Sequence, residues 1–278
     1  MGTIQARYDA SAARYRQWWE PVLAPTAVRL LAGEPPTRAD GSGPRILDLG
    51  TGAGLLAIEA ARRWPAARVT GLDVSTGMLG VAGREAEDRL GPDERRRLEF
   101  VAGDAGRLSF DDASFDLVVS SFVLQLVADR QRVVAEVRRV LRPGGRFAAV
   151  TWMAADDDAP FAPDEAFEDA LDDIDYRDES EAEEERSGDY LSADEAATEL
   201  RDAGFADVQA EAIELIHPYD PSTYAAFLEE YAEREVFEDL TPNGRRRLRD
   251  ATRARLATLN AEAFTWRVPV VQASGRRA

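Results

Sequence analysis

Between Arg45 and Trp152, short apolar runs alternate with stretches of helical character. The apolar runs predict strands at 45–50, 68–74, 98–103, 115–121 and 146–152. The stretches between them predict helices at 53–64, 75–90 and 128–141. Strands that alternate with helices form βαβ crossovers, which build a parallel sheet covered on both faces. The sequence therefore predicts an α/β, doubly wound domain.

Helical and extended segments are also expected on either side of this region. The first 40 residues are typical of helices, and a loop rich in glycine and proline follows them. After the acidic segment described next, the pattern predicts a helix at 192–203, a strand at 207–216, helices at 222–237 and 242–259, and a last strand at 264–272.

Charge is concentrated in one part of the chain. The 278 residues carry a net charge of −18, and residues 156–189 contain 17 acidic residues and two arginines. The rest of the chain is nearly neutral and lacks the broad basic face that a nucleic-acid backbone requires, so we expect no nucleic-acid partner. The acidic segment itself is typical of a flexible, solvated excursion.

Composition excludes several kinds of site. The chain has no cysteine and a single histidine, His217, so we expect no disulfide, thiol nucleophile or metal centre. No apolar run approaches the ~20 residues of a membrane-spanning helix, and the N-terminal residues lack the apolar core of a signal peptide. We therefore expect a soluble, cytoplasmic protein with no membrane partner.

The segment that carries chemical information is Ile46–Gly54, which joins the first predicted strand to the first helix. Its glycines, Gly50, Gly52 and Gly54, allow the backbone to approach a ligand closely. The spacing differs from the dinucleotide fingerprint, whose third glycine would fall at Leu55. Asp48 precedes the first glycine by two positions, where it either braces the turn or contacts the ligand directly.

Two further carboxylates follow the next two strands. Asp73 ends the second strand, where a carboxylate can accept hydrogen bonds from both ribose hydroxyls. Asp104 follows the third strand, and with the backbone amide of Ala105 it can read the edge of an adenine. The carboxyl ends of parallel strands share one edge of the sheet, so these groups are expected around a single adenosine.

With these motifs the chain resembles the class I S-adenosylmethionine-dependent methyltransferases, particularly the ubiquinone/menaquinone-type small-molecule branch. The resemblance covers roughly residues 45–152 and rests on Ile46–Gly54, Gly71–Leu79, Gly103–Ala105, Phe115–Leu126 and Val140–Gly145. It implies a Rossmann-like sheet of seven strands, the last of them antiparallel, with helical lid additions. It also implies S-adenosylmethionine as cofactor and S-adenosylhomocysteine as product.

The resemblance assigns roles to individual residues. Gly50, Gly52 and Gly54 would pass under the methionine part of the cofactor, and Asp73 would hold the ribose. The remaining expected cofactor-binding residues are Tyr15, Asp48, Thr51, Val74, Met78, Asp104, Ala105 and Ser121. Where relatives often carry histidines after the fourth strand, this chain has Leu124-Gln125-Leu126. A histidine base is therefore missing there, and no catalytic residue is assigned.

Several residues have two possible roles. His217 is either structural or a general base, and Trp18, Trp19 and Trp152 either belong to the core or line a substrate pocket. The arginines between Arg245 and Arg255 form either a solvated helix face, a site for an anionic substrate, or a partner for the acidic segment. In the last case, opposite charges would close a lid over the site, with the segment mobile until substrate binds.

Together these features predict a single methyltransferase domain over 1–278. Within it we expect an N-terminal helical cap (1–40), a cofactor-binding core (45–152), an acidic insertion (153–191) and a helical lid between strands six and seven (217–262). The expected activity is methyl transfer to oxygen, nitrogen or carbon of a small organic acceptor, by positioning and exclusion of water. The alternative is a methyltransferase-like protein that binds the cofactor but catalyses a cyclisation or rearrangement, or serves as a scaffold. A monomer or homodimer is expected.

Overall fold

The computed structural model describes residues 2–34, 36–38, 40–154, 161–174, 176 and 188–278. The chain divides into two compact units, which are described separately. The first contains 1–154, 186–213 and 269–278, and the second contains 155–185 and 214–268. Strands β6 (Phe205–Pro218) and β7 (Thr265–Arg277) contribute residues to both units.

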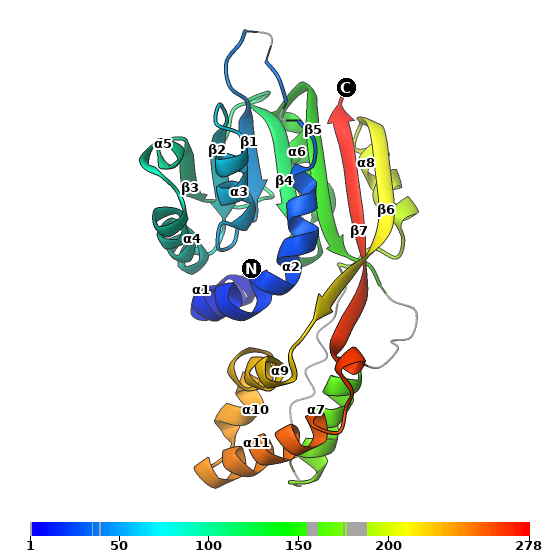
Figure 1. Ribbon diagram of the computed structural model, residues 1–278. Helices are drawn as coiled ribbons and strands as arrows, with labels where there is room; N and C mark the ends of the chain where they lie inside the picture. The colour runs from blue at the N-terminus through cyan, green and yellow to red at the C-terminus, as the bar shows by residue number, and fades with distance from the viewer. Residues whose placement is uncertain (1, 35, 39, 155–160, 175, 177–187) are drawn as a thin grey trace. The chain divides into compact units, whose positions relative to one another are not determined.

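A seven-stranded sheet with the order β3-β2-β1-β4-β5-β7-β6 organises the first unit (Figure 1). Its other strands are β1 (Arg45–Leu49), β2 (Arg68–Asp73), β3 (Leu98–Ala102), β4 (Phe115–Ser121) and β5 (Leu141–Trp152). Strands β1 to β5 pair in parallel, and β7 pairs antiparallel with β5. The α/β fold with an antiparallel last strand is therefore confirmed.

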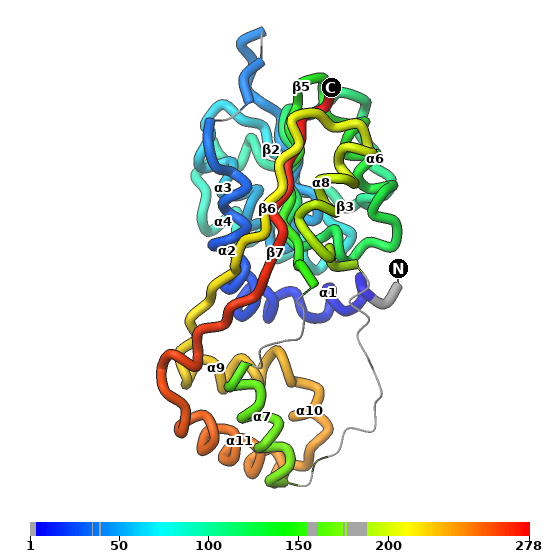
Figure 2. Tube along the Cα trace, turned by 90° about the vertical axis from the view of Figure 1, so that its right-hand side faces the viewer, coloured from blue at the N-terminus to red at the C-terminus, as the bar shows by residue number. Residues whose placement is uncertain are grey.

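Helices lie on both faces of this sheet (Figures 1 and 2). They are α2 (Glu20–Ala27), α3 (Leu55–Arg63), α4 (Thr76–Arg89), the short α5 (Pro92–Arg95), α6 (Arg130–Val140) and α8 (Ala193–Asp202). Before them, α1 (Gly2–Arg14) and a π-helical turn (Tyr15–Trp19) run along the carboxyl ends of the strands. The central strands are buried almost throughout, as expected for parallel strands covered on both faces.

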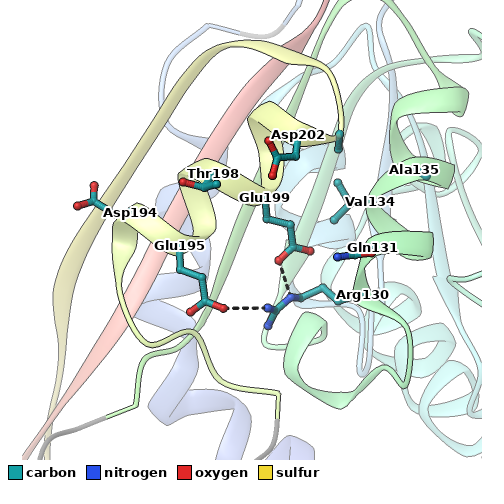
Figure 3. Close-up of a pocket in the computed structure, with 10 residues that line it drawn as sticks. Arg130, Gln131, Val134, Ala135, Asp194, Glu195, Thr198, Glu199 and Asp202 are labelled. Carbon is teal, nitrogen blue, oxygen red and sulfur yellow. Dashed lines mark hydrogen bonds and ion pairs between the residues drawn. The ribbon is translucent and has the colours of Figure 1, made fainter.

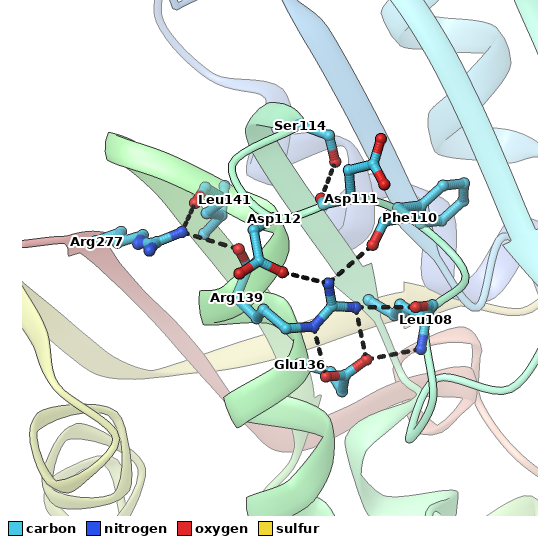
Figure 4. A network of polar contacts seen from close by, with 9 residues as sticks. All are labelled: Leu108, Phe110, Asp111, Asp112, Ser114, Glu136, Arg139, Leu141 and Arg277. Atoms are coloured by element: carbon cyan, nitrogen blue, oxygen red, sulfur yellow. Dashed lines mark hydrogen bonds and ion pairs between the residues drawn. The ribbon is translucent and has the colours of Figure 1, made fainter.

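A polar network fixes the chain between β3 and β4 against α6 (Figure 4). The Arg139 guanidinium donates to Glu136, to Asp112 and to the carbonyl oxygens of Leu108 and Phe110, over 2.7–2.9 Å. Glu136 in turn accepts from the backbone N–H of Leu108 at 2.8 Å. The segment that follows Asp104 is thereby held against α6, whose valine face is buried in the core.

The second unit is helical. It contains α7 (Ala162–Asp172), α9 (Pro221–Phe227), a π-helical turn (Leu228–Ala232), α10 (Arg234–Asp239) and α11 (Pro242–Leu256). Its core is aromatic, with Tyr224, Phe227 and Phe264 buried and the Tyr219 ring 4.9 Å from that of Tyr224. The Tyr224 hydroxyl donates a hydrogen bond to Asp164.

The acidic segment differs from its prediction where the structure describes it. Helix α7 buries Pro163, Ala166, Phe167 and Ala170, so the prediction of a flexible, solvated excursion is wrong for this part. The spacing of these four residues places them on one helical face, and the charged residues occupy the other. Most of 177–189, which was included in the same prediction, lies outside the described residues.

Candidate functional site

The glycine turn between β1 and α3 adopts a backbone that other residues rarely reach. Gly50, Gly52 and Gly54 have φ angles of +72°, +53° and +91°. The backbone N–H groups of Gly50 and Thr51 donate to the carbonyl oxygen of Leu72, at 2.8 and 2.9 Å, which fixes the turn to β2. The turn is therefore rigid before any ligand binds.

The three glycines differ in what surrounds them. A side chain at Gly50 would overlap Val123, with Cβ only 2.2 Å from a methyl carbon, and one at Gly54 would press on Ala82 at 3.0 Å. At Gly52 the nearest atom would be a ring carbon of Tyr15, 4.0 Å away. Gly52 therefore has an open side, bounded by Tyr15, and this is the space that a ligand passing over the turn needs.

Asp48 is buried beneath the turn, with 2% of its surface exposed. Its Oδ2 accepts from the Thr51 hydroxyl at 2.6 Å and from the N–H of Ala57 at 3.0 Å. Burial raises the Asp48 pKa to about 7 against the opposing effect of these hydrogen bonds. Of the two roles expected for Asp48, the structure favours bracing the turn.

Asp73 ends β2 beside the turn. Its Oδ2 accepts from the N–H of Gly52 at 2.8 Å and its Oδ1 from the N–H of Ser75 at 2.9 Å. Burial raises the Asp73 pKa, and the backbone hydrogen bonds act in the opposite direction. Both donors are neutral amides, and a carboxylate has lone pairs for further donors such as ribose hydroxyls. The next residue, Val74, is 41% exposed and offers an apolar surface beside the carboxylate.

Asp104 follows β3, the strand next to β2. Its Oδ1 accepts from the N–H of Gly106 at 2.8 Å, which holds the chain in a tight turn. Asp104 and Ala105 are both half-buried, and Ala105 packs against the main core. The ends of β1, β2 and β3 thus bring the glycine turn, Asp73 and Asp104 to one edge of the sheet.

The fourth strand contributes Ser121 and a strained residue that the sequence analysis missed. Ser121 is half-buried at the last position of β4. Phe122 has a φ of +55°, which is uncommon for an aromatic residue, and its N–H donates to the carbonyl oxygen of Val150 at 2.8 Å. Strain of this kind is concentrated at functional sites. The ring centroids of Phe122 and Trp152 lie 4.5 Å apart, and those of Trp152 and Trp19 lie 6.3 Å apart.

The N-terminal helix also reaches this edge. The rings of Tyr8 and Tyr15 lie 6.0 Å apart and pack against a buried cluster of Ala12, Ala53, Met78 and Val81. Met78 is only 2% exposed, so in this structure it has a packing role. A second residue that the sequence analysis missed is Asp9, whose carboxylate bonds with the first turn of α4.

His217 and the expected cofactor residues belong to different compact units. Its ring is half-buried, 4.4 Å from that of Tyr219, and burial lowers the His217 pKa. At the position where the resemblance leads one to expect histidine, Gln125 accepts a hydrogen bond from the Thr151 hydroxyl at 2.5 Å. The Gln125 side chain is a neutral amide, so it cannot act as the base that a histidine would supply there.

The arginine helix and the acidic segment do meet, within the second unit. Arg255 of α11 forms ion pairs with Asp169 and Asp173, at 3.1 and 2.8 Å. Arg249 pairs instead with Glu229. The expected attraction between these regions therefore joins two packed helices, α7 and α11, and does not require a mobile segment there.

A pocket of about 600 Å³ lies elsewhere, between α6 and α8 (Figure 3). Asp194, Glu195, Glu199 and Asp202 line it, and Arg130 pairs with Glu199 at 2.8 Å. None of the expected cofactor residues lines this pocket. Among the described residues, no group of three or more His, Asp or Glu side chains is arranged to hold a metal ion, and no helix is long and apolar enough to cross a membrane.

Comparison with known proteins shows which proteins part of this chain is similar to. A family model described as a methyltransferase domain matches residues 47–149. A demethylmenaquinone methyltransferase from Clavibacter sepedonicus is 46% identical over 156 residues, covering 52% of this chain and 56% of that protein. A malonyl-[acyl-carrier protein] O-methyltransferase from Geobacter sulfurreducens is 41% identical over 143 residues, which cover 51% of this chain and 48% of that protein. The chain thus spans about half the length of these relatives.

Solved structures with similar folds include a phosphoethanolamine N-methyltransferase 2 from Haemonchus contortus in complex with S-adenosylhomocysteine. Its TM-score is 0.56 at 18% identity, covering 97% of this chain and 58% of that one. The [4+2]-cyclase SpnF has a TM-score of 0.54 at 20% identity, covering 84% and 75%. At these identities the likeness shows the fold alone. The family model and the curated relatives support a methyltransferase domain at residues 47–149, and this part of the chain is similar to class I S-adenosylmethionine-dependent methyltransferases of the quinone type.

Proposed function

We propose that this protein transfers a methyl group from S-adenosylmethionine to a small organic acceptor. The observation that carries the proposal is the hydrogen bond from the N–H of Gly52 to Asp73, at 2.8 Å. It joins the glycine turn to the carboxylate expected to hold the ribose, and Asp104 follows the neighbouring strand. Methyltransferase names among the relatives and a neighbour solved with S-adenosylhomocysteine support the same cofactor.

The residues present fit this cofactor. The open side of Gly52 would take its methionine part, and Asp73 would accept hydrogen bonds from the ribose hydroxyls. The exposed Val74 would pack against the adenine, and Asp104 with the amide of Ala105 would read the adenine edge. Asp48, Thr51, Gly50, Gly54 and Met78 would hold this surface in shape from below, with Tyr15 and Ser121 at its borders.

Catalysis would rest on positioning. The bound cofactor supplies a sulfonium methyl group that is already a strong electrophile, so the protein has to align the acceptor and exclude water. Such a mechanism does not require a general base, and no catalytic residue is assigned. The rings of Phe122 and Trp152, which lie at the ends of β4 and β5, are proposed to border the acceptor.

The acceptor is proposed to be small, and the compartment cytoplasmic. Relatives named for demethylmenaquinone and for a malonyl thioester make an electron-rich ring carbon and a carboxylate oxygen the first acceptors to test. Incubation with S-adenosylmethionine and each acceptor should give methylated product and S-adenosylhomocysteine in equal amounts. Cofactor binding without either product, across both acceptor classes, would favour the alternative of a cyclisation or a scaffold.

A further inference from the structure

The N-terminal helix is attached to the cofactor edge by one carboxylate. Oδ1 of Asp9 accepts from the Ser75 hydroxyl at 2.6 Å and from the N–H of Gly77 at 2.8 Å. Both hydrogen bonds lower the Asp9 pKa, so the group is ionised at neutral pH. A negative charge at this place is favourable, because it faces the N-terminus of α4.

Ser75 makes this contact specific. Its fully buried side chain caps α4 by accepting from the N–H of Met78 at 3.0 Å, and its hydroxyl proton goes to Asp9. The first turn of α4 is therefore capped twice, once by its own N-cap residue and once by a residue from another helix. A carboxylate oxygen that accepts two such donors is fixed in position, and α1 is fixed with it.

Gly77 shows how closely the two helices approach. A Cβ at this position would lie 2.8 Å from both the Cα and the carbonyl oxygen of Asp9. Any larger residue would therefore push α1 away from α4. The contact requires backbone against backbone, and glycine is the residue that permits it.

The same loop carries the ribose carboxylate. Asp73 accepts from the N–H of Ser75 and from the N–H of Gly52, so Asp9, Ser75, Asp73 and the glycine turn form one continuous chain of hydrogen bonds. Further along, α1 leads to Tyr15, which borders the open side of Gly52. A shift of α1 away from α4 would therefore open the space above the turn.

On this geometry, and resting on the proposed function, we infer that Asp9 is a positioning residue that holds α1 over the bound cofactor and slows its release. Asp9 touches neither reacting atoms nor, in this arrangement, the expected cofactor contacts. It acts through Ser75 and through the position of Tyr15. Its removal should therefore weaken the retention of the cofactor.

The test uses S-adenosylhomocysteine as the probe and three variants of the full chain. Asp9→Ala should raise both the dissociation rate and the Kd about three- to tenfold, since two hydrogen bonds are lost. Asp9→Asn keeps an acceptor oxygen in the same place and should restore most of the affinity. Asp88→Ala removes an exposed carboxylate from α4 and should leave both values unchanged.

Hydrogen exchange of residues 2–14 in the free protein gives a readout that is independent of the cofactor. Exchange should be faster in Asp9→Ala than in the wild type, Asp9→Asn and Asp88→Ala. Equal exchange and equal Kd in all four proteins would overturn the inference, as would Asp9→Asn behaving like Asp9→Ala. A wild type that binds no S-adenosylhomocysteine, yet shows the expected exchange pattern, would contradict the proposed function and not the attachment of α1.

Discussion

Asp73 and Asp116 lie at opposite ends of the same sheet, and they are held by different partners. Asp116, near the start of β4, is fully buried and pairs with Arg38 at 3.0 Å and with Arg142, and it accepts from the N–H of Arg45 at 2.7 Å. Asp73 is held by neutral backbone amides, among them those of Gly52 and Ser75. Arginines cancel the charge of Asp116, whereas amides leave the charge of Asp73 and some of its lone pairs available to a ligand.

These different partners indicate that one end of the sheet has a structural role and that the other can bind a ligand. At the amino end, Asp116 joins the loop before β1 to the start of β5, so its loss should lower the stability of the fold. At the carboxyl end, the carboxylates are placed on glycine-rich turns with open space above Gly52. Substitution of these carboxylates should mainly weaken ligand binding.

The largest effect is expected for Asp116→Ala. It leaves two guanidinium groups beside a buried site without their partner, which costs about 3–5 kcal/mol of unfolding free energy. Urea denaturation measures this, and Asp93→Ala, at an exposed ion pair with Arg96, serves as the matched control with little change. In the fraction that remains folded, cofactor affinity should be preserved. A loss of cofactor affinity without a loss of stability would contradict the proposed difference between the two ends of the sheet.

Gly52→Ala and Gly33→Ala form the next pair. Both positions have positive φ, and an added Cβ would meet nothing closer than 4 Å at either, so each substitution should cost about 1–2 kcal/mol of stability. Only Gly52→Ala places its methyl group in the space proposed for the cofactor. Calorimetric titration with S-adenosylmethionine should therefore show weaker binding for Gly52→Ala alone. Equal affinities would mean that the open side of Gly52 is not the binding surface.

A pH titration of stability tests the carboxylate below the turn. The Asp48 pKa is about 7 in the folded protein and ordinary in the unfolded chain, so the folded state binds more protons between these values. Stability should fall as pH rises from about 4 to 7, by up to about 1.4 kcal/mol per pH unit for this group. Asp48→Asn should flatten that slope. Part of the slope should remain in Asp48→Asn, because the buried carboxyl of Glu20 also has a pKa of about 7. An unchanged slope in Asp48→Asn would contradict the assignment.

The smallest effect is expected for Arg255→Ala in the second unit. Its pairs with Asp169 and Asp173 are exposed, so they contribute little to stability and are screened by salt. The melting temperature should fall slightly at low ionic strength and match the wild type at high ionic strength. A large fall that persists in high salt would mean that α7 and α11 depend on this residue for more than charge.

Much of the first unit follows from the sequence because its strands are short, apolar and bounded by turns. The strands at Arg45, Arg68 and Phe115 begin at the residues predicted for them. Strand β5 begins at Leu141, five residues before the prediction, because Leu141 already pairs with Phe115 of β4; the register then shifts, and regular pairing resumes at Arg146. The proline and glycines of this segment predicted the end of a helix, and α6 does end just before them, at Val140.

The parts that were missed depend on contacts between distant residues. Asp9 is an ordinary helix residue in the sequence, and only its packing on Gly77 gives it a role. Phe122 is strained because β4 ends where the chain must bond with Val150. In the acidic segment, the charge run concealed four apolar residues at helical spacing, and this was the one signal that could have predicted α7.

Calorimetric titration of the wild type and Asp73→Ala with S-adenosylmethionine tests whether the cofactor binds at the carboxyl ends of β1 to β3. We expect the wild type to bind and Asp73→Ala to lose about 1.5–3 kcal/mol of binding free energy for each charge-assisted hydrogen bond to the ribose. A thermal melt run beside it should show that the variant still folds, since Asp73 is the last residue of its strand. Equal affinity in a folded Asp73→Ala variant would contradict the placement of the cofactor at this edge of the sheet.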